Sequence, residues 1–377
     1  MGKKVGIIGY SLSEFRDEQE EHQEEIIFKV TREALDKAKV PLEKVHTVIT
    51  TTTDAYDGIT ISNACLLPAA GAYLKDSTRI QNGGVASIIS ACASILSKSA
   101  EFVIVGSADQ VKFDDAVVSN ASFDSFFARP IGLTNVVSYA LMATAYMKAN
   151  KITERDLALI AAKDYQAGAK NSYAHIRKGY SVEEILASPM ISWPLRSLEI
   201  APISKGGAAL VFASEERTRE LMSNPVWITG FGAGTSPYHV DWKEKLGMPG
   251  LKHACANAYR MAGIKDPATE INDAEVFDPF SPFELLAYEV LGLCETGKAV
   301  ELFRSGKTSR DGDKPVNLSG GGLCTSPPSS GGLFRTIQAV EYLKATDKAK
   351  TAVVQDSDAV LGFGGESYAV LVLEKGV

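Results

Sequence analysis

Runs of apolar residues, bounded by glycine and polar residues, recur in the same order in the two halves of this chain. The first half contains predicted strands at Val5–Tyr10, Val45–Thr50, Arg79–Gly84, Phe102–Asp109 and Ala208–Glu215. The second half repeats the series at Val226–Gly232, Ala274–Phe280, Pro315–Gly321, Thr351–Asp358 and Tyr368–Glu374. Near-continuous apolar runs of this length are typical of strands that are covered on both faces of a sheet. The repeated order therefore predicts a duplicated α/β unit.

Helical periodicity fills the connections between these strands. Glu24–Leu35 carries apolar residues at helical spacing, and Leu251–Met261 is the corresponding helix of the second half. Ala86–Leu96, which follows the first glycine-rich turn, has no charged residue, and a helix without a charged face is expected to be buried. Its counterpart, Leu333–Leu343, carries charged residues, so we expect it to be amphipathic and nearer the surface.

The two halves differ in one long segment. Gln110–Ile203 separates the fourth and fifth strands of the first half and has no counterpart in the second half. It contains predicted helices of its own, at Ser138–Ala149 and Glu154–Tyr165. We therefore predict a first half over residues 1–222 with a loop subdomain over 110–203, and a second half over 223–377. Insertions of this length in a compact domain are usually lids or ligand-binding elements.

Composition narrows the class of protein. The chain has 377 residues and a formal net charge of −7, with acidic residues spread along it, which argues against nucleic-acid binding. No apolar run approaches the roughly 20 residues of a membrane span, and the first run is too short for a secretory signal. The 5 cysteines never form a CxxC motif, which argues against a disulfide framework and a zinc site. We expect a cytoplasmic protein without a metal.

Several stretches give the chain a resemblance to a known family. The segments that carry it are Phe127–Thr134, Pro202–Ala209, Phe277–Leu285, Leu291–Glu295 and Pro315–Gly321. Together with the duplicated layout, they resemble the thiolase superfamily, in particular the sterol-carrier-protein-type thiolases and their archaeal and bacterial relatives. The resemblance covers nearly the whole chain. It implies a thiolase fold, in which duplicated α/β halves form a layered sandwich with a loop subdomain.

The resemblance also identifies positions where thiolases carry their catalytic groups. A nucleophilic cysteine at the start of the buried helix falls on Val85, or on Gly84 if the register slips by one residue. An activating histidine falls on Pro327, and a second His or Asn on Phe277. The last glycine-rich loop, 361–365, contains no cysteine or histidine. None of these side chains can attack a carbonyl or transfer a proton, so the ordinary thiolase mechanism is not expected.

Two other residues are candidates for relocated chemistry. Cys324 lies in a turn expected to face the cleft between the halves, although an inert small residue is the simpler interpretation. Asp278 follows a predicted strand end and would be a base if burial raised its pKa, or else a turn-forming residue. Cys92 repeats an Ala-Cys-Ala-Ser string but falls inside the buried helix, where we expect a core thiol. His175 and His239 lie in predicted loops, as either acid–base groups or solvated residues.

The ligand implied by the resemblance is coenzyme A or an acyl-CoA. Gly84 and Gly321 lie in glycine-rich turns, which either let backbone amides approach a ligand or only permit close packing of the halves. Ser204 matches the family segment near the pantetheine arm, although Lys205 replaces an Asp there. Arg177 and Lys178 in the insertion are candidates for phosphate contacts, or form a solvated charged face.

Two functions remain open at this level. The missing groups favour a non-catalytic or rewired acyl-CoA-binding subunit of a larger complex in lipid metabolism. The alternative is an acyltransferase, or an aldolase-like enzyme, that makes or breaks a carbon–carbon bond of an acyl-CoA. The resemblance implies a homodimer or tetramer, and a small OB-fold, zinc-ribbon partner.

Overall fold

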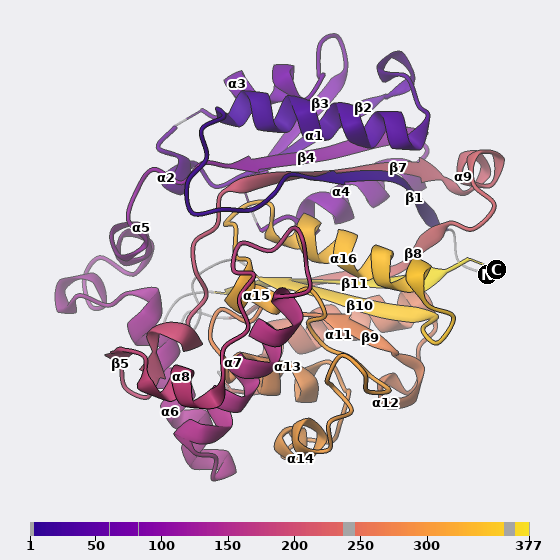
Figure 1. Cartoon of the computed structure of the whole chain (residues 1–377). Coiled ribbons are helices and arrows are strands. Elements are labelled where there is room, and N and C mark those ends of the chain that lie inside the picture. The colour runs from indigo at the N-terminus through magenta and orange to yellow at the C-terminus, as the bar shows by residue number, and fades with distance from the viewer. Residues whose placement is uncertain (1–3, 60, 82, 237–245, 358–365, 377) are drawn as a thin grey trace.

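A computed structural model describes residues 4–59, 61–81, 83–236, 246–357 and 366–376 (Figure 1). Its main sheet has the strand order β3-β2-β4-β7-β1-β8-β11-β10-β9. The strands are β1 (Val5–Leu12), β2 (Thr47–Thr52), β3 (Asp76–Gln81), β4 (Phe102–Asp109), β7 (Gly206–Ser214), β8 (Val226–Ser236), β9 (Asp273–Glu275), β10 (Thr351–Ser357) and β11 (Glu366–Lys375). A short hairpin of β5 (Met190–Ser192) and β6 (Leu195–Arg196) forms a second sheet.

The sheet is nearly symmetric about its centre, where β1 and β8 run antiparallel with Val5 opposite Ile228. Moving outward, the first half runs β1, β7, β4, β2, β3 and the second half runs β8, β11, β10, β9. Within the described residues, the second half thus has one strand fewer, at the edge of the sheet beyond β9. Val316 lies at this edge and forms an isolated parallel bridge with Ala274. The strand predicted over Pro315–Gly321 is therefore wrong beyond this bridge, because Asn317 and Gly320 have positive φ and turn the chain. The duplicated unit itself is confirmed.

Helices form layers on both sides of this sheet and between its halves (Figure 1). Helices α1 (Gln23–Ala38) and α3 (Asn63–Ala69) cover the outer face of the first half, and α11 (Pro249–Ala262) and α13 (Phe283–Val290) cover that of the second. Between the halves lie α4 (Val85–Leu96) and α16 (Gly331–Ala345), whose apolar side chains share one buried cluster with strands of both halves. This arrangement is the thiolase fold.

Helix α16 corrects one expectation. It was predicted to be amphipathic and nearer the surface, yet most of its residues are buried, including Arg335. Its polar side chains have internal partners instead of water, since Arg335 pairs with Asp356 and the Thr336 hydroxyl donates to the Gly332 carbonyl. A buried charge is tolerated when it is paired, and the partner of Arg335 lies on another element that the helix sequence does not reveal.

The chain between β4 and β7 folds mainly as helices. It contains α5 (Asp115–Ser122), η2 (Arg129–Ile131), α6 (Asn135–Asn150), α7 (Glu154–Gly168), α8 (Val182–Ala187) and η3 (Ser197–Glu199). The remaining elements are η1 (Leu42–Lys44), α2 (Asp54–Asp57), α9 (Glu215–Leu221), α12 (Pro267–Glu270), α14 (Ala299–Arg304) and α15 (Gly321–Cys324). Within the described residues, no helix is both long and apolar enough to span a bilayer.

Candidate functional site

A cavity of about 360 Å³ lies where the two halves and the insertion meet. Both halves contribute lining residues, from the ends of strands and the turns that enter α4 and α16, and the insertion contributes one face each of α5 and α6. The side chains with hydrogen-bonding capacity that line it are Thr53, Tyr56, Gln81, Asp115, Ser119, Ser122, Asn135, Tyr139, Ser326, Arg335, Asp356 and Ser357. Cavities in which an apolar wall carries a few convergent polar groups are the usual sites of ligand binding.

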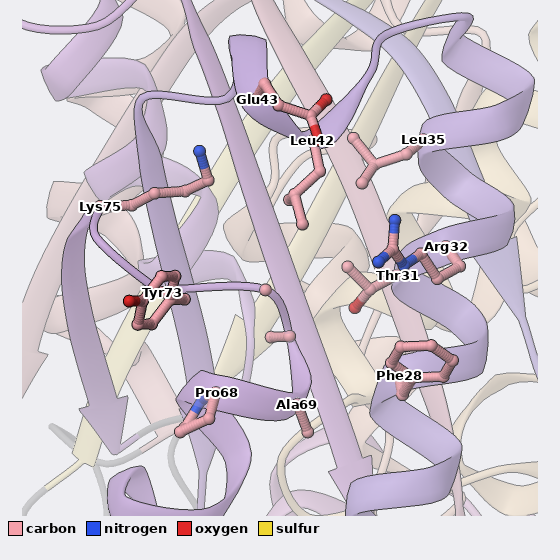
Figure 2. A pocket seen from close by; sticks show the side chains of 12 residues that line it. Phe28, Thr31, Arg32, Leu35, Leu42, Glu43, Pro68, Ala69, Tyr73 and Lys75 are labelled. Carbon is pink, nitrogen blue, oxygen red and sulfur yellow. The ribbon is translucent and has the colours of Figure 1, made fainter.

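A second cavity, of about 310 Å³, lies on the outer face of the first half between α1 and the chain after α3 (Figure 2). Figure 2 shows Phe28 and Arg32 on one side of it and Tyr73 and Lys75 on the other. The Lys75 ammonium already donates to the Val45 carbonyl at 2.9 Å. Because this cavity is lined by a single half and is remote from the glycine-rich turns, we take the cavity between the halves as the candidate site.

One wall of the candidate site is the N-terminus of α4, where the resemblance placed a nucleophile. Val85 is fully buried, and its backbone amide donates to Asp356 Oδ2 at 3.3 Å. Gly84 precedes it with φ +117°, and a Cβ there would lie 3.0 Å from the backbone nitrogen of Leu333. Glycine at position 84 thus permits close packing of α4 against α16, which was one of its two interpretations. A ligand contact at Gly84 remains a prediction.

A buried ion pair forms the floor of this site. Arg335 on α16 donates from Nη2 to Asp356 Oδ1, and its guanidinium lies 5.0 Å from the centroid of the Phe277 ring. Its Nε and Nη1 atoms are buried without a hydrogen-bond partner. Burial raises the pKa of Asp356, whereas the Arg335 charge lowers it. The cavity therefore contains a desolvated cation with unused donors, which can stabilise negative charge on a ligand.

An acid–base pair also lines the cavity. Tyr56 on α2 donates its hydroxyl to Asp115 Oδ1 at 2.5 Å, and Asp115 is the first residue of α5. Burial raises the pKa of Tyr56 and of Asp115, so the tyrosine keeps its proton and the carboxyl holds protons more tightly than usual. Tyr139 on α6 stacks on Phe280 beside this pair, with ring centroids 4.9 Å apart. A carboxylate whose proton affinity is raised in this way is suited to general acid–base chemistry.

Sequence reasoning missed these residues. Tyr56 and Asp115 are distant in sequence and follow no motif, so nothing in the chain pairs them. The sequence contains a weak indication of the role of Arg335, because it is a charged residue among the apolar positions of Leu333–Leu343.

Cys324 does not face the cavity, contrary to the expectation. Its side chain is fully buried at the end of α15, and its thiol donates to the Asp164 carbonyl of α7 at 3.4 Å. Gly168 of the same helix lies against it, since a Cβ at 168 would be 2.5 Å from the sulfur. Burial raises the pKa of the Cys324 thiol well above its ordinary value, which suppresses the reactive thiolate. Cys92 is buried in α4 as predicted.

Asp278 is also buried, beneath the second glycine-rich turn. Its Oδ1 accepts a hydrogen bond from the Gly322 amide at 2.5 Å, and its Oδ2 has no partner. Burial raises the pKa of Asp278 to about 8, with a further contribution from the nearby Glu284. Gly321, at φ +63°, leaves room for this carboxylate, because a Cβ there would lie 2.5 Å from Asp278 Oδ1. Asp278 is not among the described lining residues of the cavity. Its contact with the glycine-rich turn is the hydrogen bond to Gly322, which stabilises that turn.

Asp278 belongs to a group of three buried carboxyls. Oxygens of Asp164, Asp278 and Glu284 lie within 4.8 Å of one another. The Lys163 ammonium forms ion pairs with Asp164 at 3.1 Å and with Glu284. The ammonium therefore balances part of the negative charge of this group.

Ser204 connects the insertion to the turn at 325–328. Its hydroxyl accepts from the Ser326 amide at 3.0 Å and lies 3.0 Å from His175 Nδ1. Burial lowers the pKa of His175, which keeps the ring neutral, and this residue is not among the described lining residues of the cavity.

Arg177 and Lys178 are exposed on the insertion. Arg177 lies 3.5 Å from Glu14, and Lys178 lies 3.8 Å from Glu184 and over the ring of Tyr180. Such exposed pairs are weak and exchange partners readily, so both cations remain predicted phosphate contacts. The last glycine-rich loop, 361–365, and His239 lie outside the described residues.

Comparison with known proteins agrees with the fold. The family described as thiolase C-terminal domain-like matches residues 232–374. An acetyl-CoA acetyltransferase of Methanothermobacter thermautotrophicus is 33% identical over 192 residues, which cover 50% of this chain and 49% of the relative. The 17-hydroxy-3-oxo-4-pregnene-20-carboxyl-CoA lyase of Mycobacterium tuberculosis is 30% identical over 207 residues, 53% of each chain. The chain thus spans about half the length of these curated relatives.

Among solved structures, the Ltp2-ChsH2(DUF35) aldolase superposes with a TM-score of 0.84 at 24% identity, over 98% of this chain and 97% of that one. At this identity the superposition shows the fold alone. The sequence of the chain is similar to thiolases and, among them, to sterol carrier protein 2 of Gallus gallus, which is 32% identical over 178 residues.

Proposed function

We propose that this protein is an aldolase-like enzyme that cleaves or forms a carbon–carbon bond of an acyl-CoA without a cysteine acyl-enzyme. One observation carries the proposal. The cavity brings together the Tyr56–Asp115 acid–base pair and the Arg335 cation, which has unused donors. The lyase among the sequence relatives supports this enzymatic function over the non-catalytic subunit that the sequence alone favoured.

The positions of the thiolase catalytic groups agree with this choice. Val85, Pro327 and Phe277 stand where a thiolase carries its nucleophile and two of its polar groups, and none of them can form an acyl-enzyme. Among the described residues that line the cavity, there is no cysteine or histidine. A reaction that breaks a carbon–carbon bond through an enolate needs a base and an oxyanion site, but no nucleophile on the protein.

The chemistry that fits is retro-aldol cleavage of a 3-hydroxyacyl-CoA. A base takes the proton of the 3-hydroxyl, the C2–C3 bond breaks, and C3 becomes a carbonyl. The electron pair of the broken bond delocalises onto the thioester oxygen as an enolate, and C2 then takes up a proton. The reverse sequence forms the bond.

We assign these steps to residues of the cavity. Asp115 accepts the hydroxyl proton, with Tyr56 holding the carboxylate in place through its hydrogen bond. Arg335 stabilises the enolate oxygen, because its Nε and Nη1 are charged donors without a partner in a desolvated site. A positioned base contributes about 10²–10⁴-fold to such a rate.

Coenzyme A is the proposed carrier of the acyl group. We expect the exposed cations Arg177 and Lys178 to attract its phosphates, and the buried Ser204 to lie beside its pantetheine arm. Since the name of the superposed aldolase contains a second component, ChsH2(DUF35), we also propose that this chain works with a small second subunit.

The test uses the full chain, purified with any bound subunit, and the 17-hydroxy-3-oxo-4-pregnene-20-carboxyl-CoA that the relative is named for, alongside a short 3-hydroxyacyl-CoA. Tyr56→Phe should lower kcat by about 10²-fold or more, and Arg335→Lys should lower it while the fold is retained. Tyr73→Phe is the matched control, because Tyr73 is 81% exposed on the outer face. Thiolysis of a 3-ketoacyl-CoA at roughly 1 per second or faster, with a covalent acyl adduct, would overturn the proposal.

A further inference from the structure

The wall that the insertion contributes to the cavity contains a buried amide oxygen without a hydrogen-bond partner. Asn135 is 4% exposed, lines the cavity, and has no hydrogen-bond partner for its Oδ1 atom. Its backbone amide is satisfied by the Ser119 hydroxyl at 3.4 Å, so the unmet requirement belongs to the side chain alone.

The surrounding elements hold Asn135 in this place. It is the first residue of α6, and the preceding Thr134 caps the helix by accepting from the Val137 amide at 3.5 Å. Tyr139 lies one turn further along the same side of α6 and also lines the cavity. From α5, Ser119 and Ser122 line it as well, but the Ser122 hydroxyl already donates to the Val118 carbonyl at 3.0 Å. Asn135 is thus a fixed amide with a free acceptor.

A buried amide oxygen without a hydrogen-bond partner lowers the stability of the folded protein. Leaving a donor or acceptor unsatisfied costs about 1–3 kcal/mol, which a ligand atom of the right kind recovers when it binds. A site that is built to hydrogen-bond a substrate group rejects analogues without that group far more strongly than an apolar pocket rejects an extra methylene. The lining residues Val118, Val136, Ile200 and Ile203 are apolar and offer no such selectivity.

We propose that Asn135 determines specificity by accepting, at Oδ1, a hydrogen bond from a hydroxyl on the acyl group of the substrate. This hydroxyl is separate from the alcohol that is cleaved and from the thioester. An amide oxygen accepts hydrogen bonds and a hydroxyl donates one, so a hydroxyl satisfies the atom that has no partner. The inference rests on the proposed function in that both place the acyl group in this cavity.

The test measures binding, so that its failure is distinct from a failure of the proposed chemistry. Calorimetric titration of the full chain compares the 3-hydroxy form of 17-hydroxy-4-pregnene-20-carboxyl-CoA with its 3-deoxy analogue, which lacks this hydroxyl. The wild type should bind the 3-hydroxy form about 10-fold or more tightly, and Asn135→Leu should lose this preference while its affinity for the deoxy form stays within about 3-fold. Binding with the expected preference but without turnover would retain this inference and reject the aldolase.

A second variant identifies the polar group. Asn135→Asp keeps an acceptor and loses the donor, so it should retain the preference for the 3-hydroxy form, and the 3-oxo form should gain nothing over the deoxy form. Equal affinity of the wild type for the 3-hydroxy and deoxy forms, or binding of neither, would overturn the inference. An equal loss of affinity for both forms in Asn135→Leu would show that Asn135 only supports the fold, and thermal melting of each variant checks that the fold is intact.

Discussion

The Asp356 carboxylate of the second half accepts a hydrogen bond from the backbone amide of Val85 in the first half, at 3.3 Å. Asp356 lies near the end of β10, and Val85 is the first residue of α4. The reciprocal contact exists as well, because Asp109 at the end of β4 accepts from the amides of Ser329 and Ser330 at 2.7 and 2.9 Å, just before α16. Each half therefore places a carboxylate at the positive end of the other half's buried helix. Asp356 also lines the candidate site.

Removal of the Asp356 carboxylate should strongly destabilise the protein. Asp356→Ala leaves the Arg335 charge buried without its partner, and breaking a buried pair in this way costs about 3–5 kcal/mol. Urea unfolding, followed by circular dichroism, measures the loss. Glu301→Ala, which breaks the exposed Lys298–Glu301 pair, should leave the midpoint of unfolding unchanged. A small effect of Asp356→Ala would mean that water reaches the guanidinium.

Gly332 should not tolerate a side chain. A Cβ there would lie 2.3 Å from Asp356 Oδ2 and 2.6 Å from the backbone nitrogen of Val85, so Gly332→Ala forces α4 and α16 apart. Overpacking of this kind costs about 1–3 kcal/mol, and we expect the upper end because a backbone atom must move. Thermal melting measures the loss, with Ser97→Ala at the exposed end of α4 as the control. A wild-type melting temperature for Gly332→Ala would contradict the packing of the two helices.

The stability of the fold should fall between about pH 4 and pH 8. The folded protein raises the pKa of Asp278 from 3.8 to about 8, so it binds more protons than the unfolded chain across this range. The free energy of unfolding therefore decreases as the pH rises through the range. Glu284 and Asp164 add negative charge beside Asp278, whereas Lys163 and Arg335 oppose it.

Asp278→Asn should reduce this pH dependence. The amide keeps an acceptor for Gly322 and cannot ionise, so the variant should be more stable than the wild type by roughly 1 kcal/mol at pH 8 and gain less at pH 5. Urea titrations at several pH values provide the measurement. Asp311→Asn, at an exposed carboxylate, should leave the profile unaltered. Parallel profiles for Asp278→Asn and the wild type would show that Asp278 is ionised throughout.

Cys324 should be inert in the native protein. Its thiol is buried and its pKa is raised by burial, so iodoacetamide should modify it only after unfolding. The partly exposed Cys65 should react first, and Cys92 should resist modification along with Cys324. Peptide mapping by mass spectrometry after a timed native reaction identifies the sites. Rapid labelling of Cys324 that coenzyme A prevents would instead restore it as a group of the active site.

Much of the candidate site could not be predicted from the sequence. The positions of Val85, Phe277 and Pro327 followed from the resemblance, and Phe277 and Pro327 do line the cavity. Cys324 was predicted to face it from its place in a turn, but side-chain direction depends on the short helix α15 and on Gly168 of α7, which a turn motif does not specify. Asp278 could be identified as a residue at a strand end, but not as one of three clustered carboxyls.

The sequence by itself determined the duplicated order of strands and the burial of one apolar face of α4, because apolar periodicity and charge are local properties of the chain. Only the tertiary structure decided that α16 is buried, that Tyr56 meets Asp115, and that Arg335 has two donors left over. Each of these depends on a partner from a distant segment. The residue type fixes which hydrogen bonds and ion pairs a side chain can make. Whether it makes them depends on which partner atoms the folded chain brings within about 3 Å of it.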